Sequence, residues 1–522
     1  MHRHKSRLIR TFAAICACTL FIGGCGSSAT GNNADSGGEP VAGGVLNALQ
    51  SAEPRTLDPA GLNNVWAANP LLGNALYGEL MINNLDTFEV EYKMATAFTT
   101  NDGGTTFSLT LRPGLMFTDG TPLDAAAVKF NWDRLRNPAL ASASIRVAGQ
   151  VADTEVVDPS VLKVILTQPN PHFAQGLVAT SLNWIASPTA LQKGAAEFDK
   201  APVGAGPFRL TKWTRQDVIE LEKNTEYWDA PKPYLDGLTI RTAADSTQRF
   251  NAITTGAADL SSESNRSTLA NAENAGVSTE IVTTSGGQYF AANVRSAPFD
   301  DIRARQAVAL AIDPETINSS VYNGQGLVPT TLFDKSSPFF TDTPLPTPDK
   351  AAAQALFDDL ATDGKPLSFT FLAFPGLESK MSAESLQTQL SAFDNVEVKI
   401  ETSDYAGVLA KIGTHNFDMT IGSVDIQDPD YAMWASFHGA STGNFTGIND
   451  PELNEALDAG RTPETTGERT AAYARAEERL SQLHPALWYV RPAPAAMWSK
   501  DVNGVQMYTL GSIMPEELWM TQ

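Results

Sequence analysis

The chain has 522 residues, of which 42% are hydrophobic and 18% charged, so its length predicts about three globular domains with cores of their own. Its 59 Asp and Glu exceed its 37 Lys and Arg by 22, and no basic stripe interrupts the acidic balance. A surface of this kind repels phosphate backbones, so the composition argues against a nucleic-acid-binding protein.

The first 24 residues differ in composition from the rest. Four basic residues between positions 3 and 10 precede an apolar run at 11–22, which is the charge order of a secretory signal. The run is shorter than the roughly 20 residues that span a bilayer, which disfavours a transmembrane anchor. Its end, Ile22-Gly-Gly-Cys25, resembles the lipobox of bacterial lipoproteins, so Cys25 is the expected lipidation site. The alternative is an ordinary signal peptide followed by an incidental cysteine.

Cysteine usage fits a secreted chain. Cys16 and Cys18 would leave with the signal, so Cys25 alone would remain, without a disulfide framework or a cysteine-based metal site. Removal of residues 1–24 leaves 33 Lys and Arg against 59 Asp and Glu, a balance of −26. Residues 26–44 are rich in Gly, Ser and Asn and have almost nothing to bury, so they are predicted to form a flexible tether.

The folded part is expected to begin near Val45. A strand and a turn are predicted between 45 and 59, and apolar spacing predicts a helix over 70–80. Alternating apolar residues at 107–111 predict a half-buried strand, after which Asp124 can cap a helix. Further helices are predicted at 349–361 and 466–483.

Residues 105–137 carry the first specific signature, Leu-Arg-Pro-Gly-Leu-Met-Phe-Thr-Asp-Gly-Thr-Pro followed by Val-Lys-Phe. This segment resembles the family 5 extracellular solute-binding proteins of ABC importers, the oligopeptide- and dipeptide-binding group. It departs from the family pattern at Ala127, where aspartate is usual. The resemblance continues in order at 202–210, 221–238 and 298–313 and covers nearly all of residues 45–520.

Two apolar segments far apart in the chain are predicted to pair. Residues 287–293 form one expected strand, which is followed by Pro298, a helix capped by Asp300 and a second helix capped by Asp313. Residues 486–491 form the other, between two prolines. Such a pair would tie one lobe to another, as in a cleft that opens and closes.

The resemblance and the two strands imply an α/β fold of the periplasmic-binding-protein type, with two lobes around a ligand cleft, two crossing strands and an extra domain. The signal peptide is placed at 1–24, and the lipidated Cys and tether at 25–44. The expected boundaries are 45–76, 201–286 and 490–522 for domain I, 77–200 for domain II and 287–489 for domain III.

Candidate ligand chemistry lies at 416–430. A strand is predicted at 419–424, and a carboxylate at its end would face the cleft. The family resemblance implies an aspartate in this loop that pairs with the ligand's α-ammonium, and anchoring on Asp428-Pro429 places Asp425 there. The family's tryptophan is absent and the spacing is short, so the alternative is that both aspartates serve turns. The candidate ligand-binding residues are Asp425, Asp428, Trp434, Tyr289 and Asn293.

Catalytic and metal motifs fit poorly. Gly439-Ala-Ser-Thr-Gly443 matches a nucleophile elbow, but a loop is predicted where the elbow needs a helix, so Ser441 is not expected to be a nucleophile. Ser160 and Lys163 lie three apart on a predicted strand and point to opposite faces. The histidines of the mature chain share no ligand spacing. We therefore expect no metal site and no cofactor.

The sequence predicts the substrate-binding lipoprotein of an ABC importer, which captures di- or oligopeptides and delivers them to permease and ATPase subunits. We expect an extracytoplasmic or periplasmic monomer, held at the outer face of the cell membrane by its lipid and without a nucleic-acid partner. One alternative keeps the binding role for a metal chelate, glycan or other solute. The other is an extracellular serine hydrolase, which lacks a nucleophile, base and orienting group at credible spacing.

Overall fold

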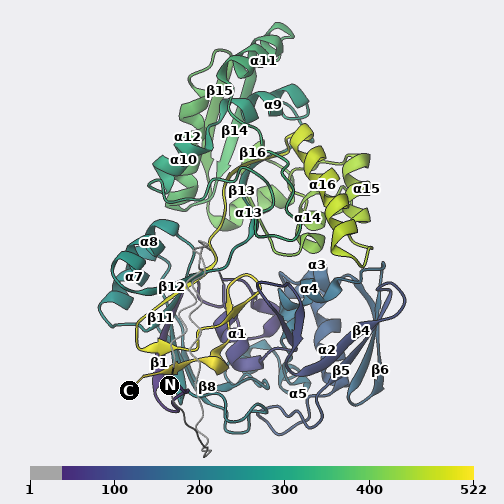
Figure 1. Ribbon diagram of the computed structural model, residues 1–522, viewed down its shortest axis with the longest axis vertical. Coiled ribbons are helices and arrows are strands. Elements are labelled where there is room, and N and C mark those ends of the chain that lie inside the picture. The colour runs from purple at the N-terminus through teal and green to yellow at the C-terminus, as the bar shows by residue number, and fades with distance from the viewer. Residues whose placement is uncertain (1–37, 67, 522) are drawn as a thin grey trace, which may run out of the picture. The chain divides into compact units, whose positions relative to one another are not determined.

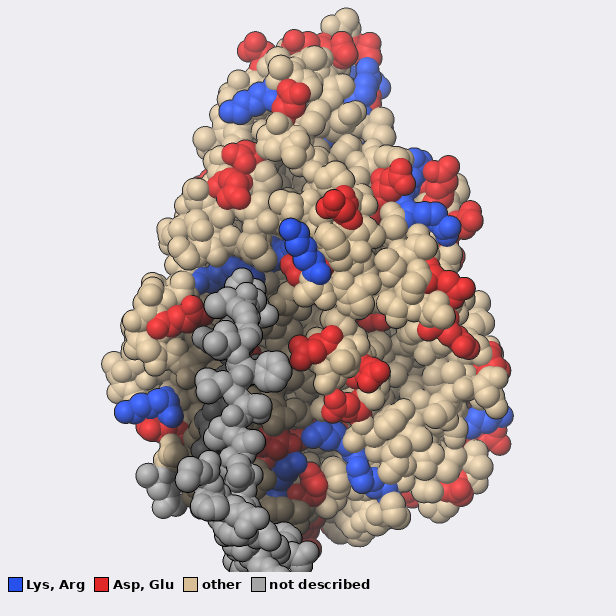
Figure 2. Space-filling model, viewed as in Figure 1, with Lys and Arg blue, Asp and Glu red and all other residues tan. Residues whose placement is uncertain are grey.

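The computed structural model of the protein describes residues 38–66 and 68–521, a part that contains both helices and strands (Figure 1). The predicted signal, Cys25 and most of the tether lie outside the described residues. From Pro40 onward the chain forms one compact unit. No helix in the described ranges is long and apolar enough to cross a membrane. On the face shown in Figure 2, acidic and basic side chains are interspersed and form no extended basic patch.

A seven-stranded sheet gathers segments from both ends and the middle of the chain. Its order is β12 (Ser278–Ile281), β18 (Ala495–Trp498), β11 (Leu260–Glu263), β1 (Val45–Gln50), β10 (Gly237–Thr242), β9 (Val218–Lys223) and β8 (Phe208–Thr214). The central β1 is parallel to both β10 and β11. Its Leu46 packs in one core with Leu72 and Leu76 of α1 (Pro70–Tyr77). Two more helices accompany this sheet, α7 (Ser246–Thr254) and α8 (Arg266–Asn274).

A four-stranded antiparallel sheet follows the first helix. Its order is β4 (Ala95–Thr100), β5 (Thr106–Leu111), β7 (Val161–Leu166) and β6 (Val151–Asp158). Helix α2 (Ala125–Leu135) buries Val128, Trp132 and Leu135 in the core of this sheet. The predicted cap is confirmed, because the Asp124 side chain accepts a hydrogen bond from the Ala127 amide at 2.9 Å. Short helices complete this part: α3 (Ile145–Ala148), α4 (Phe173–Val178), α5 (Pro188–Leu191) and α6 (Ala195–Phe198).

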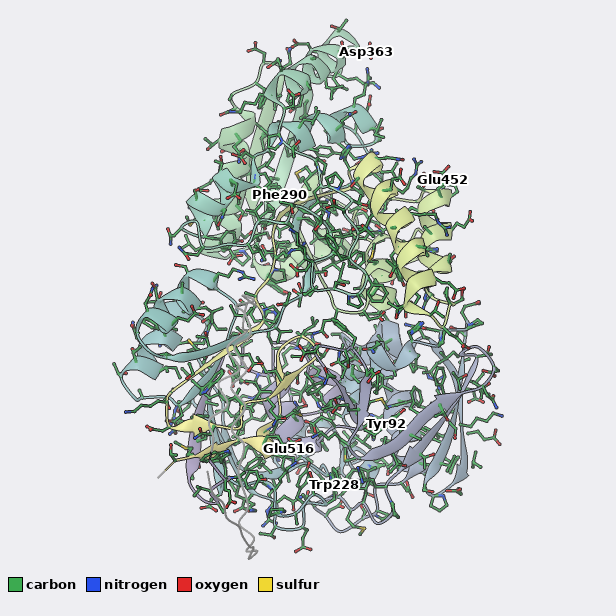
Figure 3. All side chains as sticks on the ribbon, in the orientation of Figure 1. Tyr92, Trp228, Phe290, Asp363, Glu452 and Glu516 are labelled. Carbon is green, nitrogen blue, oxygen red and sulfur yellow. The ribbon has the colours of Figure 1, made fainter. Side chains whose placement is uncertain are left out.

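A five-stranded sheet is built from the second half of the chain. Its order is β15 (Val396–Thr402), β14 (Leu367–Ala373), β16 (Met419–Ile426), β13 (Ser285–Ala292) and β17 (Ala486–Val490). Phe290 of β13 is fully buried in it and stacks on Tyr489 at 4.6 Å between ring centroids (Figure 3). The surrounding helices are α9 (Ile302–Ala311), α10 (Pro314–Val321), α11 (Lys350–Thr362), α12 (Leu377–Leu390), α13 (Tyr405–Gly413), α14 (Pro429–Phe437), α15 (Pro451–Ala459) and α16 (Thr466–Leu483).

The predicted pairing of 287–293 with 486–491 is confirmed, because β13 and β17 are antiparallel neighbours. Strand β12 of the seven-stranded sheet precedes β13, and β18 of the same sheet follows β17. Residues 282–284 and 491–494 therefore cross between the two sheets. The crossings lie side by side, since the Val282 amide donates to the Pro494 carbonyl at 2.7 Å. The buried Arg491 anchors one of them by donating to the carbonyls of Thr331 and Leu332.

Two predicted helix ends need correction. Asp301, not Asp300, caps α9, and its carboxylate accepts from the Arg303 amide at 3.0 Å. Asp300 belongs to the preceding turn, where its amide donates to the Ser296 carbonyl. Helix α1 ends at Tyr77 rather than at 80, because Gly78 takes a positive φ of 63° that ends the helical path.

The C-terminal return packs against the region after α1. It contains β19 (Val502–Asn503) paired with β22 (Trp519–Met520) and β20 (Met507–Tyr508) paired with β21 (Ser512–Ile513), and a further pair, β2 (Met81–Asn83) with β3 (Val90–Tyr92), follows α1. Glu516 of this return (Figure 3) and Glu79 are both buried, and their carboxylate oxygens have no hydrogen-bond partner among the described residues. Burial raises the pKa of both carboxyl groups, and the Lys93 ammonium, 3.5 Å from Glu516 Oε1, opposes this shift.

Candidate functional site

Two adjoining cavities lie where segments of different sheets meet. The first has a volume of about 250 Å³ and is lined by Asn63 and Val65, by residues within 143–180 and 423–436, and by Thr509 and Leu510. The second, of about 400 Å³, is lined by residues within 145–168 and 431–461. They share Arg146, Tyr431 and Ala435, so we treat them as one cleft. Concave sites between separately built parts of a chain are where proteins commonly bind small ligands.

Polar contacts bridge the cleft at its edges. Asn170 Nδ2 donates to Asp430 Oδ2 at 2.6 Å, and Arg461 Nη2 donates to Gln150 Oε1 at 2.9 Å. Each of these pairs joins the four-stranded part of the chain to the segment after β16. Because only a few hydrogen bonds of this kind join the two sides of the cleft, they can break when the cleft opens.

Asp425 lies near the end of β16, one residue before the strand finishes, and lines the first cavity. It stands opposite Gly286 in the antiparallel register. Its side chain is half-buried, and among the described residues its carboxylate accepts one hydrogen bond, from Ser423 Oγ at 3.4 Å. Burial raises the pKa of this carboxyl to about 6, and no arginine or lysine among the described residues pairs with it. Asp425 is therefore a carboxylate in the cleft that has no counter-ion within the described part of the chain.

Gly286 leaves room for this arrangement. Its φ is 77°, a conformation that favours glycine, and a Cβ there would lie 2.2 Å from the Val424 carbonyl oxygen. The residue opposite Asp425 is therefore fixed as glycine by both its backbone conformation and the close approach of β16.

Asp428 also lines the first cavity, but its carboxylate is already engaged. It caps α14 by accepting from the Asp430 amide at 2.9 Å. It also forms a two-point ion pair with the buried Arg469, at 2.8 and 2.7 Å. The neighbouring Asp430 is paired in turn with Arg461 at 2.6 Å. The structure thus brings Asp425 and Asp428 to one cavity and leaves only the first without a cationic partner among the described residues.

Trp434 lies in the second cavity. Its indole Nε1 donates to Asp458 at 2.9 Å, its ring stacks on His438 at 4.6 Å between centroids, and the Arg461 guanidinium lies 5.0 Å from the ring centroid. Trp434 therefore gives the cavity a rigid apolar wall, and the neighbouring Arg461 is already paired with Asp430.

Tyr289 and Asn293 do not line either cavity. Tyr289 is buried and packs against Trp488 and Phe437, with ring centroids 4.7 and 5.8 Å away. Asn293 is buried and donates to the carbonyls of His415 and Phe417. Tyr289 of β13 thus belongs to a hydrophobic core cluster, and Asn293, which directly follows β13, is held inside the fold by its hydrogen bonds.

Several lining residues carry no sequence motif. Many of them come from the short helices α3 and α4 and from α14, and the polar ones include Arg146, Gln175, Thr180, Gln427 and Tyr431. The sequence does hold a signal for Tyr431. It lies three residues after Asp428, the cap of α14, and residues at this spacing share one face of a helix. Nothing in the sequence around Arg146 distinguishes it from an ordinary surface arginine.

The hydrolase motif is not arranged as an elbow. Ser441 follows α14 instead of a strand, and a loop comes after it, as predicted. Its hydroxyl donates to the Ala435 carbonyl at 2.6 Å rather than to a histidine. Within the ranges that the structure describes, no cluster of three or more His, Cys, Asp and Glu side chains could hold a metal ion.

Comparison with known proteins agrees with this geometry. The model of "Bacterial extracellular solute-binding proteins, family 5 Middle" matches residues 89–444. The glutathione-binding protein GsiB of Salmonella paratyphi A is 31% identical over 287 residues, which cover 53% of this chain and 54% of that protein. The chain thus spans about half the length of the curated relatives it matches.

Solved structures confirm the expected two-lobed α/β fold of the periplasmic-binding-protein type. AgaA of A. tumefaciens R10, in complex with agropinic acid, has a TM-score of 0.79 at 24% identity, covering 92% of this chain and 99% of its own. The binding protein DppA of Helicobacter pylori, in complex with the peptide STSA, has a TM-score of 0.79 at 22% identity with the same coverage. The family model covers most of the described fold, including both walls of the cleft, and the chain belongs to the bacterial extracellular solute-binding proteins of family 5.

Proposed function

We propose that this protein captures peptides with a free amino terminus in its cleft and delivers them to the permease of an ABC importer. The observation that carries the proposal is Asp425, a half-buried carboxylate in the cleft without a cationic partner among the described residues. A peptide's α-ammonium is positive at neutral pH and needs such a partner when water is excluded. The names of relatives, one glutathione-binding and one in complex with a peptide, support a peptide ligand.

A second candidate ligand is a non-peptide solute. It is favoured by the similarity to AgaA, whose structure holds agropinic acid. One fold can serve different ligands because specificity lies in a few side chains of the cleft. Under this alternative the transport role is unchanged and only the ligand differs.

The division into domains at 45–76, 201–286 and 490–522, at 77–200 and at 287–489 is part of the proposal. The seven- and four-stranded sheets fall into the first two groups, and the five-stranded sheet falls into the third except for residues 285–286 of β13 and 490 of β17, which supports it. The paired crossings at 282–284 and 491–494 would then act as the hinge on which the cleft closes around a peptide.

Binding should depend on pH in a defined direction. The ammonium pairs with the ionised form of Asp425, whose pKa is raised to about 6. Below that pH the carboxyl group is mostly protonated and must lose its proton before it can pair with the peptide. The affinity for a free peptide should therefore fall about tenfold between about pH 7 and pH 5. Calorimetry with one tripeptide and its N-acetylated form measures this. The acetylated peptide should bind weakly at both pH values, and equal affinity for the two forms at neutral pH would contradict the proposal.

Lipid anchoring at Cys25 completes the proposed role, since a captured solute must reach a permease in the membrane. A Cys25→Ala variant should lose incorporated radiolabelled lipid and move from the membrane fraction to the soluble fraction. A serine at Ser27, two residues on, offers a matched control, and Ser27→Ala should remain in the membrane. Unchanged membrane retention of Cys25→Ala would place the anchor elsewhere.

A further inference from the structure

Some charged side chains of the cleft have no oppositely charged partner within the described chain. Of its three aspartates, Asp428 is paired with Arg469 and Asp430 with Arg461. Two charged groups remain, Asp425 and Arg146. Arg146 lines both cavities and forms no hydrogen bond or ion pair with any described residue. The cleft therefore presents one carboxylate and one guanidinium that have no partner within the described chain.

The position of Arg146 is defined by its surroundings. It comes from α3, and its guanidinium lies against Gly443, where a Cβ would be 2.0 Å from Nη1 and 3.0 Å from Cζ. Any side chain at 443 would displace the guanidinium, so the last glycine of the 439–443 loop makes room for it. A Cβ at 443 would also lie 2.9 Å from the Ala435 carbonyl oxygen, so this loop packs closely against both α14 and the Arg146 guanidinium.

We propose that Arg146 binds a carboxylate of the ligand, so that the ligand class is a zwitterion with its ammonium at Asp425 and its carboxylate at Arg146. The inference rests on the proposed function and extends it from the amino end of the ligand to an acidic group. A planar guanidinium can bind a carboxylate through two parallel hydrogen bonds, which neutral ligand groups cannot match. An arginine left unpaired when water is excluded costs free energy, and an anionic ligand removes that cost.

The carboxylate could be the carboxyl terminus of a short peptide or an acidic side chain within it. Both present the same group to Arg146, and a set of probes can separate them. The probes are an alanine tripeptide as free acid, its C-terminal amide, and the amide of a tripeptide that ends in glutamate. Binding restored in the glutamate amide would identify the side chain as the source.

The variants are Arg146→Gln, Arg146→Lys and Arg475→Gln. Arg475 is the matched control because it is exposed on α16, outside both cavities, and forms no ion pair or hydrogen bond with the described residues. Arg146 is also exposed in this structure, so its replacement should leave folding intact, which circular dichroism can verify.

We expect the wild type and Arg475→Gln to bind a carboxylate-bearing probe at least about tenfold more tightly than the plain amide. Arg146→Gln should lose this preference, and Arg146→Lys should recover part of it through its charge. The inference is overturned if Arg146→Gln and the wild type distinguish acid from amide equally well.

The inference and the peptide proposal fail in different ways. If the solute that co-purifies with the wild type is not a peptide, the peptide proposal fails, and Arg146 is then tested with that solute and its methyl ester. A loss of affinity on esterification in the wild type, absent in Arg146→Gln, would support the inference for that solute. Equal affinity of the wild type for the solute and its ester would overturn it.

Discussion

Replacing Asp425 with asparagine is expected to weaken the binding of a peptide with a free amino terminus by about 2–5 kcal/mol. Asparagine keeps the shape of the side chain but removes its charge, so the ligand's ammonium would be left without a counter-ion in a closed cleft. The affinity for the N-acetylated peptide should hardly change, because that ligand carries no ammonium. Calorimetry with both peptides measures the difference directly.

The stability of the free protein should not fall in this variant. The folded-state pKa of Asp425, about 6, lies above its ordinary value, so ionisation of this group disfavours the folded state as pH rises through about 6. Asparagine removes that cost at neutral pH. A suitable control is Asp217→Asn, since Asp217 is exposed in the turn between β8 and β9 and its carboxylate has no partner among the described residues. A similar loss of affinity in both variants would mean that the effect is not specific to the cleft.

Replacing Arg469 with glutamine is expected to lower the free energy of unfolding by about 3–5 kcal/mol. Arg469 is buried, holds Asp428 through two hydrogen bonds and donates a third to the Gly460 carbonyl. Without it, Asp428 would keep a largely buried charge at the wall of the cleft with no cation beside it. Urea denaturation near neutral pH gives the free energy.

Arg475→Gln on the same helix is the control for this measurement, because Arg475 is exposed and unpaired within the described chain. Part of the loss should return in mildly acidic buffer, since a carboxyl that has lost its counter-ion takes up a proton more readily. A change below about 1 kcal/mol would indicate a pair as weak as an ordinary surface ion pair.

Local features of the fold were predictable because their causes are local. The sequence predicts the caps at Asp124 and Asp313, since a short acidic side chain before a periodic segment satisfies free amides at a helix start. The helix at 466–483 was expected with its observed bounds. The pairing of β13 with β17 is not local, but it could also be predicted because both are apolar runs ended by prolines.

The site was less predictable because it is assembled from segments far apart in the chain. Arg146 becomes notable only when α3 meets the loop at Gly443, almost 300 residues later in the sequence, and no local pattern marks it. Tyr289 is among the predicted ligand-binding residues, yet the structure places it in the core. Sequence alternation cannot tell a cleft-facing side chain from a core one when both faces of a strand are covered.

The most direct test of the account is native mass spectrometry of the protein as purified, followed by release and identification of any retained solute. A cleft whose Asp425 carboxylate and Arg146 guanidinium have no charged partner in the described ranges predicts a retained short peptide with a free amino terminus and at least one free carboxylate. Asp425→Asn should retain less of it than the wild type. A retained solute that lacks an amino group, held equally by both proteins, would contradict the central claim.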